Sequence, residues 1–409
     1  MAKIQKEYGY PKRFSAYAGK NKPERVIKAV EILGGSWGMG SAMQSTDPDV
    51  LEAIKRQNIS SDKLLGFVDY AKLNDSTAYF ELILGLPLDS KKKHYESMRL
   101  GVDTGLNNSK SYQLTLLLGT EIASQESRVK YEYVTKWRVM PRCFGIYQIL
   151  EKTINVAETE EIVIGNSTMS TEDYLDCRML DFFVDVFINS NWFREPIALI
   201  QKLGFSVFDF LLFLKSSPNL YDETLYDIFL QFKHLTMSDL FDSKGDIDQF
   251  ISDADIINLH IDGNRGINEM NECKALCYKN IDSVFDTVYT GVISFLEEKG
   301  SCTEEITNYI QELKVFSLMR KLPFDQEKRL MQRNFEYNFK KIEEKKYFID
   351  LSDLEIPESF TTKVWHDKKQ ENEFSNLVRI YGDSLAGLGK IIQTQDMSRF
   401  ERKFEQFPR

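Results

Sequence analysis

Segments with the pattern of β-strands and α-helices alternate along the first 116 residues, and this alternation constrains the fold most strongly. Strands are expected over residues 12–17, 38–44, 77–84 and 109–116, where short apolar runs are bounded by turn residues. Helices are expected over residues 23–33, 48–56, 63–73 and 91–102. Such alternation is typical of parallel βα units. The sequence therefore predicts an α/β region with a parallel sheet.

The carboxyl ends of two expected strands carry residues that suit a ligand site. The strand ending at Gln44 is followed by Asp47, which can cap the next helix, and by Pro48, which suits its first turn. The next strand runs into Gly85, where a ligand can approach the backbone, and into Pro87, which stops the ladder. Parallel α/β proteins build sites at this edge. We therefore expect a site for a nucleotide-type cofactor.

Strand side chains alternate between the two faces of a sheet, so the faces can be predicted. One face of the third expected strand is apolar and should pack on helices; it consists of Phe80, Leu82 and Leu84. A cavity on the other side would be polar and would be lined by Gln44, Glu81 and Gln113. The alternative is that each polar side chain is simply paired at a strand end.

These stretches resemble the second half of a radical S-adenosylmethionine (SAM) barrel of the type fused to a cobalamin-binding domain. The matching residues are YPKR at 10–13, KPERV at 22–26, QS at 44–45, VL at 50–51, Arg56, ILGLP at 83–87, GTE at 119–121 and RVMPR at 138–142. The resemblance implies a partial (βα) barrel over residues 1–149, the carboxy-terminal half of a radical SAM barrel. A mainly α-helical extension is expected over residues 150–409.

The resemblance also implies which residues bind SAM: Gln44, Arg56, Ile83, Gly85 and Leu116. Gln44 and Arg56 would contact the methionine portion of SAM, and the other three would border the adenine. An arginine offers a planar fork to a carboxylate, and an amide can donate or accept hydrogen bonds. The alternative for Arg56 is a surface residue paired with Glu52 at i−4.

The family's activity is reductive cleavage of SAM by a [4Fe-4S] cluster, often with cobalamin as methyl carrier. The chain contains neither the cluster motif CxxxCxxC nor the cobalamin motif DxHxxG. We therefore expect the carboxy-terminal portion of a radical SAM enzyme that is inactive alone. An upstream extension or a separate chain would supply the amino-terminal half with cluster and cobalamin.

Two other functions remain open. The chain can be a non-catalytic interaction or scaffold protein that keeps a degenerate half-barrel and binds partners through its helical extension. It can also be an unrelated small-molecule enzyme of the βα class, which would require a complete barrel. Gln44, Arg56 and the strand end at residues 83–87 favour the enzyme, because a scaffold has no need of them. The substrate does not follow from the sequence.

The five cysteines do not suggest a metal site. Only Cys273 and Cys277 are close in sequence, and Asn280 stands where a third ligand of a cluster motif would be. Two thiolates without a nearby third ligand rarely close a site. Buried packing of both residues is the expected alternative, and no metal ligand is assigned. The odd number of cysteines without paired spacing argues against a disulfide framework and for a reducing compartment.

The formal net charge of −10 argues against a nucleic-acid partner, because phosphate binding needs a concentrated basic surface. The basic run at residues 91–93 with His94 is expected on a solvated surface turn. The first ten residues lack the apolar region of a secretory signal, and the longest apolar stretch, residues 205–214, is too short to span a bilayer. We therefore expect a cytoplasmic protein without a membrane span.

The carboxy-terminal region has mostly helical apolar spacing. After a short strand and turn at residues 160–168, helices are expected over residues 172–189, 193–203, 205–215, 222–236, 245–258, 267–299 with a break, 303–320 and 328–346. Residues 347–351 fit a strand. The aromatic stripes of these helices are expected to form a core. The four histidines have no paired metal-ligand spacing, and the chain has neither a Walker loop nor a glycine-rich dinucleotide fingerprint.

Overall fold

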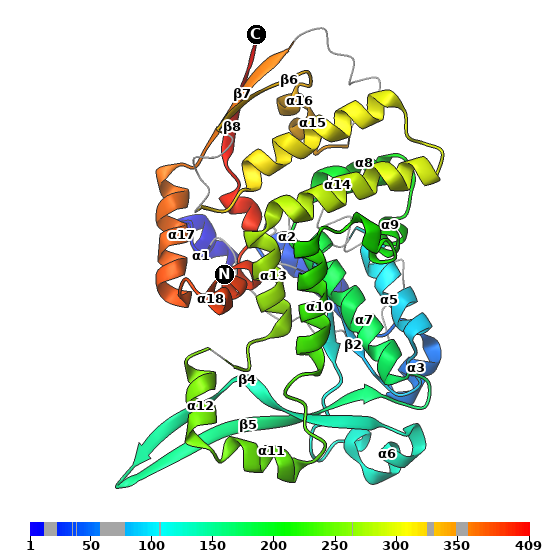
Figure 1. Ribbon diagram of the computed structural model, residues 1–409, viewed down its shortest axis with the longest axis vertical. Helices are drawn as coiled ribbons and strands as arrows, with labels where there is room; N and C mark the ends of the chain where they lie inside the picture. Colours follow the sequence, from blue (N-terminus) through cyan, green and yellow to red (C-terminus); the bar gives the residue numbers. More distant parts are fainter. Residues whose placement is uncertain are drawn as a thin grey trace. The chain divides into compact units, whose positions relative to one another are not determined.

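The computed structural model describes residues 1–11, 23–34, 36–37, 39–57, 78–105, 108–263, 265–324, 331–348 and 359–409. The chain forms two compact units, shown in Figure 1. Unit 1 consists of Met1–Val184 and Asp239–Ile261, and unit 2 of Asp185–Ser238 and Asp262–Arg409. Each unit has its own β-structure and its own buried core.

A three-stranded parallel sheet forms the part of unit 1 that the sequence predicts best. Its order is β1 (Met39–Gln44), β2 (Ala78–Leu84), β3 (Asn108–Gln113). The helices before and between these strands are α1 (Ala2–Tyr8), α2 (Pro23–Ile32), α3 (Pro48–Ala53) and α5 (Lys91–Asp103). The α/β alternation is therefore confirmed. The strand expected at residues 12–17 and the helix expected at 63–73 lie outside the described residues, and the partial barrel stays a prediction.

One face of this sheet is apolar, as expected. Phe80, Leu82 and Leu84 are fully buried, and α5 packs against β2. The register pairs Leu84 with Gln113, so these neighbours lie on the same face, whereas Glu81 points to the opposite one. The expected cavity lined by both Glu81 and Gln113 is therefore wrong. The prediction failed because the face that each residue shares with its neighbour depends on the register between the strands. Alternation within a single strand does not determine that register.

A long antiparallel hairpin follows the parallel sheet in unit 1. It consists of β4 (Val134–Ile149) and β5 (Lys152–Gly165), and residues 149–150, the expected domain boundary, lie at its turn. Only the end of β5 was expected as a strand. The alternation of β4 is interrupted by Pro141 and by a register shift between Val139 and Phe144, which weakens its strand pattern. Other elements of unit 1 are η1 (Glu121–Ala123), α6 (Gln125–Tyr131), α7 (Thr171–Val184), α11 (Lys244–Ile251) and α12 (Ala254–Ile261).

Unit 2 is mainly helical, as expected. Its helices are η2 (Asp185–Asn189, a π-helix), α8 (Arg194–Lys202), α9 (Val207–Lys215), η3 (Pro218–Leu220), α10 (Glu223–Met237), α13 (Glu269–Lys279), α14 (Ile281–Glu298), α15 (Glu304–Lys321), α16 (Phe339–Glu344), α17 (Lys368–Tyr381), α18 (Leu385–Thr394) and η6 (Met397–Phe400). The expected break in residues 267–299 falls at Asn280. The aromatic stripes are buried: Phe193 contacts the ring of Phe285 at 4.9 Å between centroids.

Unit 2 also contains an antiparallel sheet that the sequence did not predict. Its order is β6 (Gln332–Phe335), β7 (Phe360–Trp365), β8 (Lys403–Pro408). The prediction of a helix over residues 328–346 is therefore wrong, because β6 and a turn precede α16. Phe335 is buried against Phe316 and Phe339, so packing of an aromatic side chain overrides the local helical pattern. Tyr347, where a strand was expected to begin, lies in a turn.

Within the described residues, a membrane-spanning length of apolar sequence is not found in any one helix. Helices α8 and α9 reach that length and composition only as a pair, and the pair is bent by 119°.

Candidate functional site

The turn after β1 is fixed by capping and by α5. Gln44, the last residue of β1, has a positive φ of 61°. Asp47 accepts hydrogen bonds at 3.1 Å from two backbone N–H groups in the first turn of α3, so its expected capping role is confirmed. The backbone N–H of Thr46 donates to Oγ of the buried Ser97 on α5 at 3.0 Å. The end of β1 is therefore held in place.

The turn after β2 is held just as firmly. Gly85 is buried and has a φ of 87°, a conformation that favours glycine. A Cβ there would lie 3.4 Å from the carbonyl oxygen of Val163 on β5. Asp89 Oδ2 accepts from the Gly85 N–H at 3.4 Å, and Asn166 Nδ2 donates to the Leu86 carbonyl at 2.9 Å. The structure thus explains this glycine by its positive φ, since the Cβ contact with β5 is of ordinary van der Waals length.

Two of the predicted adenine-side residues lie in one apolar cluster. Ile83 packs, half-buried, against a cluster that contains Leu116. The remaining buried members of this cluster are Val50, Leu86, Leu114 and Val163. Leu116 is only 5% exposed, and its N–H donates to the Glu161 carbonyl at 2.8 Å. The structure therefore brings Ile83 and Leu116 together at the carboxyl edge of the sheet.

Arg56 lies just after α3 with an exposed side chain. Its backbone N–H donates to the Leu51 carbonyl at 2.9 Å. Arg56 therefore lies at the surface, as the alternative expected, but within the described part of the chain it forms no ion pair with Glu52. The SAM contacts of Gln44, Arg56, Ile83, Gly85 and Leu116 stay predictions.

A buried charged network adjoins this edge, and sequence reasoning missed it. His94 is 2% exposed, so its expected place on a solvated turn is wrong. Its Nε2 lies 3.2 Å from Asp181 Oδ1 on α7, and its Nδ1 lies 3.9 Å from Asp89 Oδ2. Arg178 Nη1 lies 3.5 Å from Asp181 Oδ2. The neighbouring Lys93 is partly exposed and pairs with Asp47 at 2.9 Å.

Burial and charge shift the titration of two members of this network. Burial raises the pKa of Asp89 from 3.8 to about 6, although the charge of His94 opposes this. Burial lowers the pKa of His94, but the hydrogen bond and charge of Asp181 outweigh it, so the net direction is upward. Asp89 also accepts the Gly85 N–H. A titrating carboxyl therefore holds the glycine turn at the candidate site.

A second polar group lies where β3 meets the hairpin. Arg138 on β4 pairs with Glu160 at 2.7 Å, and it also donates to the side-chain oxygen of Gln113. Gln113 in turn donates to the hydroxyl of Tyr174 on α7, and Thr115 Oγ1 donates to Glu160 at 3.1 Å. Gln113 is therefore paired at its strand end, as the alternative interpretation expected.

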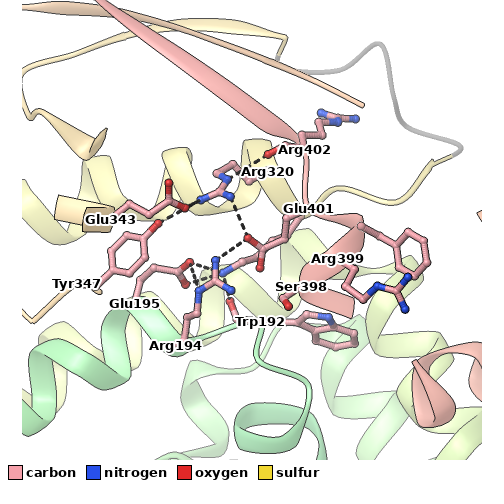
Figure 2. Close-up of polar contacts among 12 residues, drawn as sticks. Trp192, Arg194, Glu195, Arg320, Glu343, Tyr347, Ser398, Arg399, Glu401 and Arg402 are labelled. Carbon is pink, nitrogen blue, oxygen red and sulfur yellow. Dashed lines mark hydrogen bonds and ion pairs between the residues drawn. The ribbon is translucent and has the colours of Figure 1, made fainter. Parts of the chain in front are cut away.

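Unit 2 contains a denser charged network, shown in Figure 2. Lys321 is fully enclosed and donates to both carboxylate oxygens of Glu195 at 2.6 and 2.5 Å and to the Trp192 carbonyl at 2.7 Å. Arg194 donates to Glu401 at 2.6 Å. The three N–H groups of Lys321 are thereby all used.

Arg320 completes this network from the last turn of α15. It pairs with Glu343 at 2.5 Å and with Glu401 at 3.3 Å, and it donates to the Tyr347 hydroxyl at 3.2 Å (Figure 2). The cations and carboxylates of the network match in number: Arg194, Arg320 and Lys321 against Glu195, Glu343 and Glu401. Balanced charges with short contacts indicate a structural role in joining α8, α15, α16 and the segment before β8.

The described residues do not fit an iron–sulfur cluster. No group of three or more His, Cys, Asp or Glu side chains within them has the arrangement of a metal site. Cys273 and Cys277 are buried in α13, and burial raises the pKa of Cys277 to about 12 and that of Cys273 as well. Without a metal, such thiols stay protonated at neutral pH.

Comparison with known proteins gives two curated relatives. The chain is 29% identical over 191 residues to the 2-(S-pantetheinyl)-carbapenam-3-carboxylate methyltransferase of Streptantibioticus cattleyicolor. It is 28% identical over 184 residues to the cobalamin-dependent radical SAM methyltransferase TokK of Streptomyces tokunonensis. Each match covers 43% of this chain and 26% of the relative.

The chain therefore spans about a quarter of the length of the curated relatives it matches. No family model matches it. The resemblance inferred from the strand-end residues is supported at this level: part of the chain is similar to methyltransferases, one of which is named as a cobalamin-dependent radical SAM enzyme.

Proposed function

We propose that this chain is the carboxy-terminal, SAM-binding portion of a cobalamin-associated radical SAM enzyme. The observation that carries the proposal is its similarity to the two methyltransferases, one of them cobalamin-dependent and of the radical SAM class. The parallel sheet adds support, because its carboxyl edge is where such α/β proteins bind ligands. The amino-terminal half, as an upstream extension or a second chain, would supply cluster and cobalamin.

SAM would bind at the carboxyl edge of β1, β2 and β3. Gln44 and Arg56 would hold its methionine portion, since an exposed guanidinium and a half-buried amide suit a carboxylate and an amino group. Ile83, Gly85 and Leu116 would border the adenine. Two observations support this assignment: Ile83 and Leu116 share an apolar cluster, and Gln44 and Gly85 lie at the ends of adjacent strands. Bound SAM supplies the transferable group, and these residues orient it.

We assign the cluster chemistry to the proposed amino-terminal half, since the described residues do not fit a cluster. We expect anaerobic reconstitution of the purified chain with iron and sulfide to give no stoichiometric cluster. Iron content and the charge-transfer absorption of the cluster measure this. A full cluster that is lost in Cys273→Ala and Cys277→Ala would contradict the assignment.

Calorimetric titration with SAM tests the proposal. We expect Arg56→Ala to weaken binding by about 1.5–3 kcal/mol, the value of a charge-assisted contact. The matched control is Arg99→Ala on α5, which removes a partly exposed arginine that lies 3.7 Å from Glu96 and 3.8 Å from Asp103. That variant should bind SAM as the parent does. Equal affinity of parent and Arg56→Ala would show that Arg56 does not contact SAM.

The second candidate is a non-catalytic interaction protein that uses the half-barrel as a scaffold. The extensive helical unit 2, in which Lys321 and Glu195 form a buried structural pair, is compatible with it. Absence of SAM binding, both by the chain alone and by the chain together with a complementing amino-terminal half, would favour this candidate.

A further inference from the structure

The free end of the β4–β5 hairpin has two unlike faces. Its inner face carries Phe144, whose ring lies 5.2 Å from that of the buried His260 on α12. The register places Ile146 and Gln148 on the same side, opposite Asn155 and Thr153. Helices α11 and α12 pack on the hairpin, and its free end reaches beyond them in Figure 1.

The outer face is exposed and apolar. The register pairs Tyr147 with Ile154 and Gly145 with Val156, so these residues share one side. The exposed fractions are 55% for Tyr147, 55% for Ile149, 39% for Ile154 and 40% for Val156. We call Tyr147, Ile149, Lys152, Ile154, Val156 and Glu158 the outer face. A two-stranded ribbon with one uncovered apolar face is marginally stable in water.

Two opposite charges flank the apolar residues of the outer face. Along β5, alternate positions read Lys152, Ile154, Val156, Glu158. Both charged side chains are exposed, and neither forms an ion pair within the described part of the chain. They are six positions apart along the strand, about 20 Å.

We propose that the outer face packs against the same face of a second copy of this chain, with the two hairpins antiparallel about a twofold axis. This arrangement places Lys152 of each copy opposite Glu158 of the other and buries the four apolar side chains between them. Face-to-face ribbons pack in this way when apolar residues alternate along the strands. A twofold interface requires a self-complementary surface. The outer face meets this requirement, because it has a cation, Lys152, at one end and an anion, Glu158, at the other.

The charge pattern distinguishes a second copy from a membrane. An anionic lipid surface attracts clusters of basic residues, whereas the outer face has one cation and one anion on a chain of net charge −10. The apolar surface is small, so we expect a weak, concentration-dependent dimer.

Sedimentation equilibrium of the 409-residue chain at micromolar concentrations tests the proposal through charge reversal. The parent should show a monomer–dimer equilibrium. Lys152→Glu and Glu158→Lys should each weaken dimerisation about tenfold, because like charges then meet, and the double variant should recover to within about threefold of the parent. The control is Glu151→Lys in the turn, which makes the same charge change off the outer face and should leave the equilibrium unchanged.

Four results would overturn the proposal. They are a monomer at every concentration, assembly beyond the dimer, a dimer insensitive to the single reversals, and a double variant as weak as the singles. A chain that stays monomeric alone would mean that the outer face serves a different occupant. All substitutions are at exposed positions, so circular dichroism and melting of each variant should match the parent and exclude misfolding as a cause.

Discussion

Both units of the protein bury charged side chains, but they pair them differently. In unit 2, Lys321 and Glu195 lie 2.5 Å apart, and every N–H of the ammonium group has an acceptor. In unit 1, the contacts of His94 with Asp181 and Asp89 are 3.2 and 3.9 Å. The first network is closed and balanced. The second has longer contacts, and burial raises the pKa of its Asp89 to about 6.

The difference separates a structural network from one that can respond to its surroundings. Lys321 and Glu195 join two helices of unit 2 that lie 126 residues apart in the chain. Asp89 instead accepts the N–H of Gly85, the glycine at the candidate SAM edge. Buried charge alone does not indicate function. The unit 1 network is distinguished by its location beside strand ends and by its longer contacts.

The largest expected effect is the loss of the closed network in unit 2. Lys321→Met should lower the free energy of unfolding by about 3–5 kcal/mol, because Glu195 is left as an incompletely paired buried charge. Lys314→Met is the control in the same helix, since it removes a partly exposed pair with Asp286 and should cost less than about 1 kcal/mol. Urea unfolding of both variants measures the difference. Equal losses would show that the network is not what stabilises unit 2.

The next effect is a pH dependence confined to unit 1. The raised pKa of Asp89 means that the folded state binds this proton more tightly than the unfolded chain, so stability falls as pH rises from about 4 to about 6. The raised pKa of His94 acts in the same direction above pH 6.5. The pKa of Glu195 is lowered by Lys321 and Arg194 against the effect of burial, so its stabilisation is lost only below about pH 4.5.

Asp89→Asn should therefore flatten the pH dependence of α5 by up to about 3 kcal/mol, the difference between pKa values of 3.8 and about 6. Hydrogen exchange of α5 amides between pH 4 and 7, corrected for intrinsic rates, measures it. Peptides from α8 and α15 in unit 2 serve as the internal control and should not change between pH 5 and 7. An unchanged slope in α5 would contradict the titration of Asp89.

A smaller effect is expected from the hydroxyl that anchors the end of β1. Ser97→Ala removes the acceptor of the Thr46 N–H and should cost about 1–2 kcal/mol. Faster exchange should appear at residues 44–47 but not in unit 2. Uniform destabilisation of both units would mean that Ser97 does not act locally.

Local sequence patterns predicted the parts of the candidate site that depend only on residues close together in the sequence. The cap by Asp47, the glycine turn at Gly85 and the apolar face of β2 follow from strand and helix patterns. The pairing of His94 with Asp181 joins residues 87 positions apart, and that of Lys321 with Glu195 joins residues 126 apart. Such contacts depend on how helices pack, which single-segment patterns do not encode.

The same reasoning explains the elements that were missed. In the β4–β5 hairpin, the alternation of apolar and polar residues along β4 is broken at Pro141 and at the register shift after Val139. Strand β6 is stabilised by the aromatic contacts of Phe335. The register between β2 and β3 placed Gln113 against α7 and not beside Glu81. Register and long-range packing therefore account for most of the differences between expectation and structure.

Hydrogen exchange of the chain with saturating SAM tests the proposed SAM site most directly. If the chain alone binds SAM weakly, the experiment is done in the presence of the complementing amino-terminal half. We predict slower exchange at residues 44–46 and 83–89, which lie at the ends of β1 and β2, and no change in the unit 2 peptides that contain Glu195 and Lys321. Protection confined to unit 2, or no protection at either strand end under conditions where SAM is bound, would contradict a SAM site on the parallel sheet.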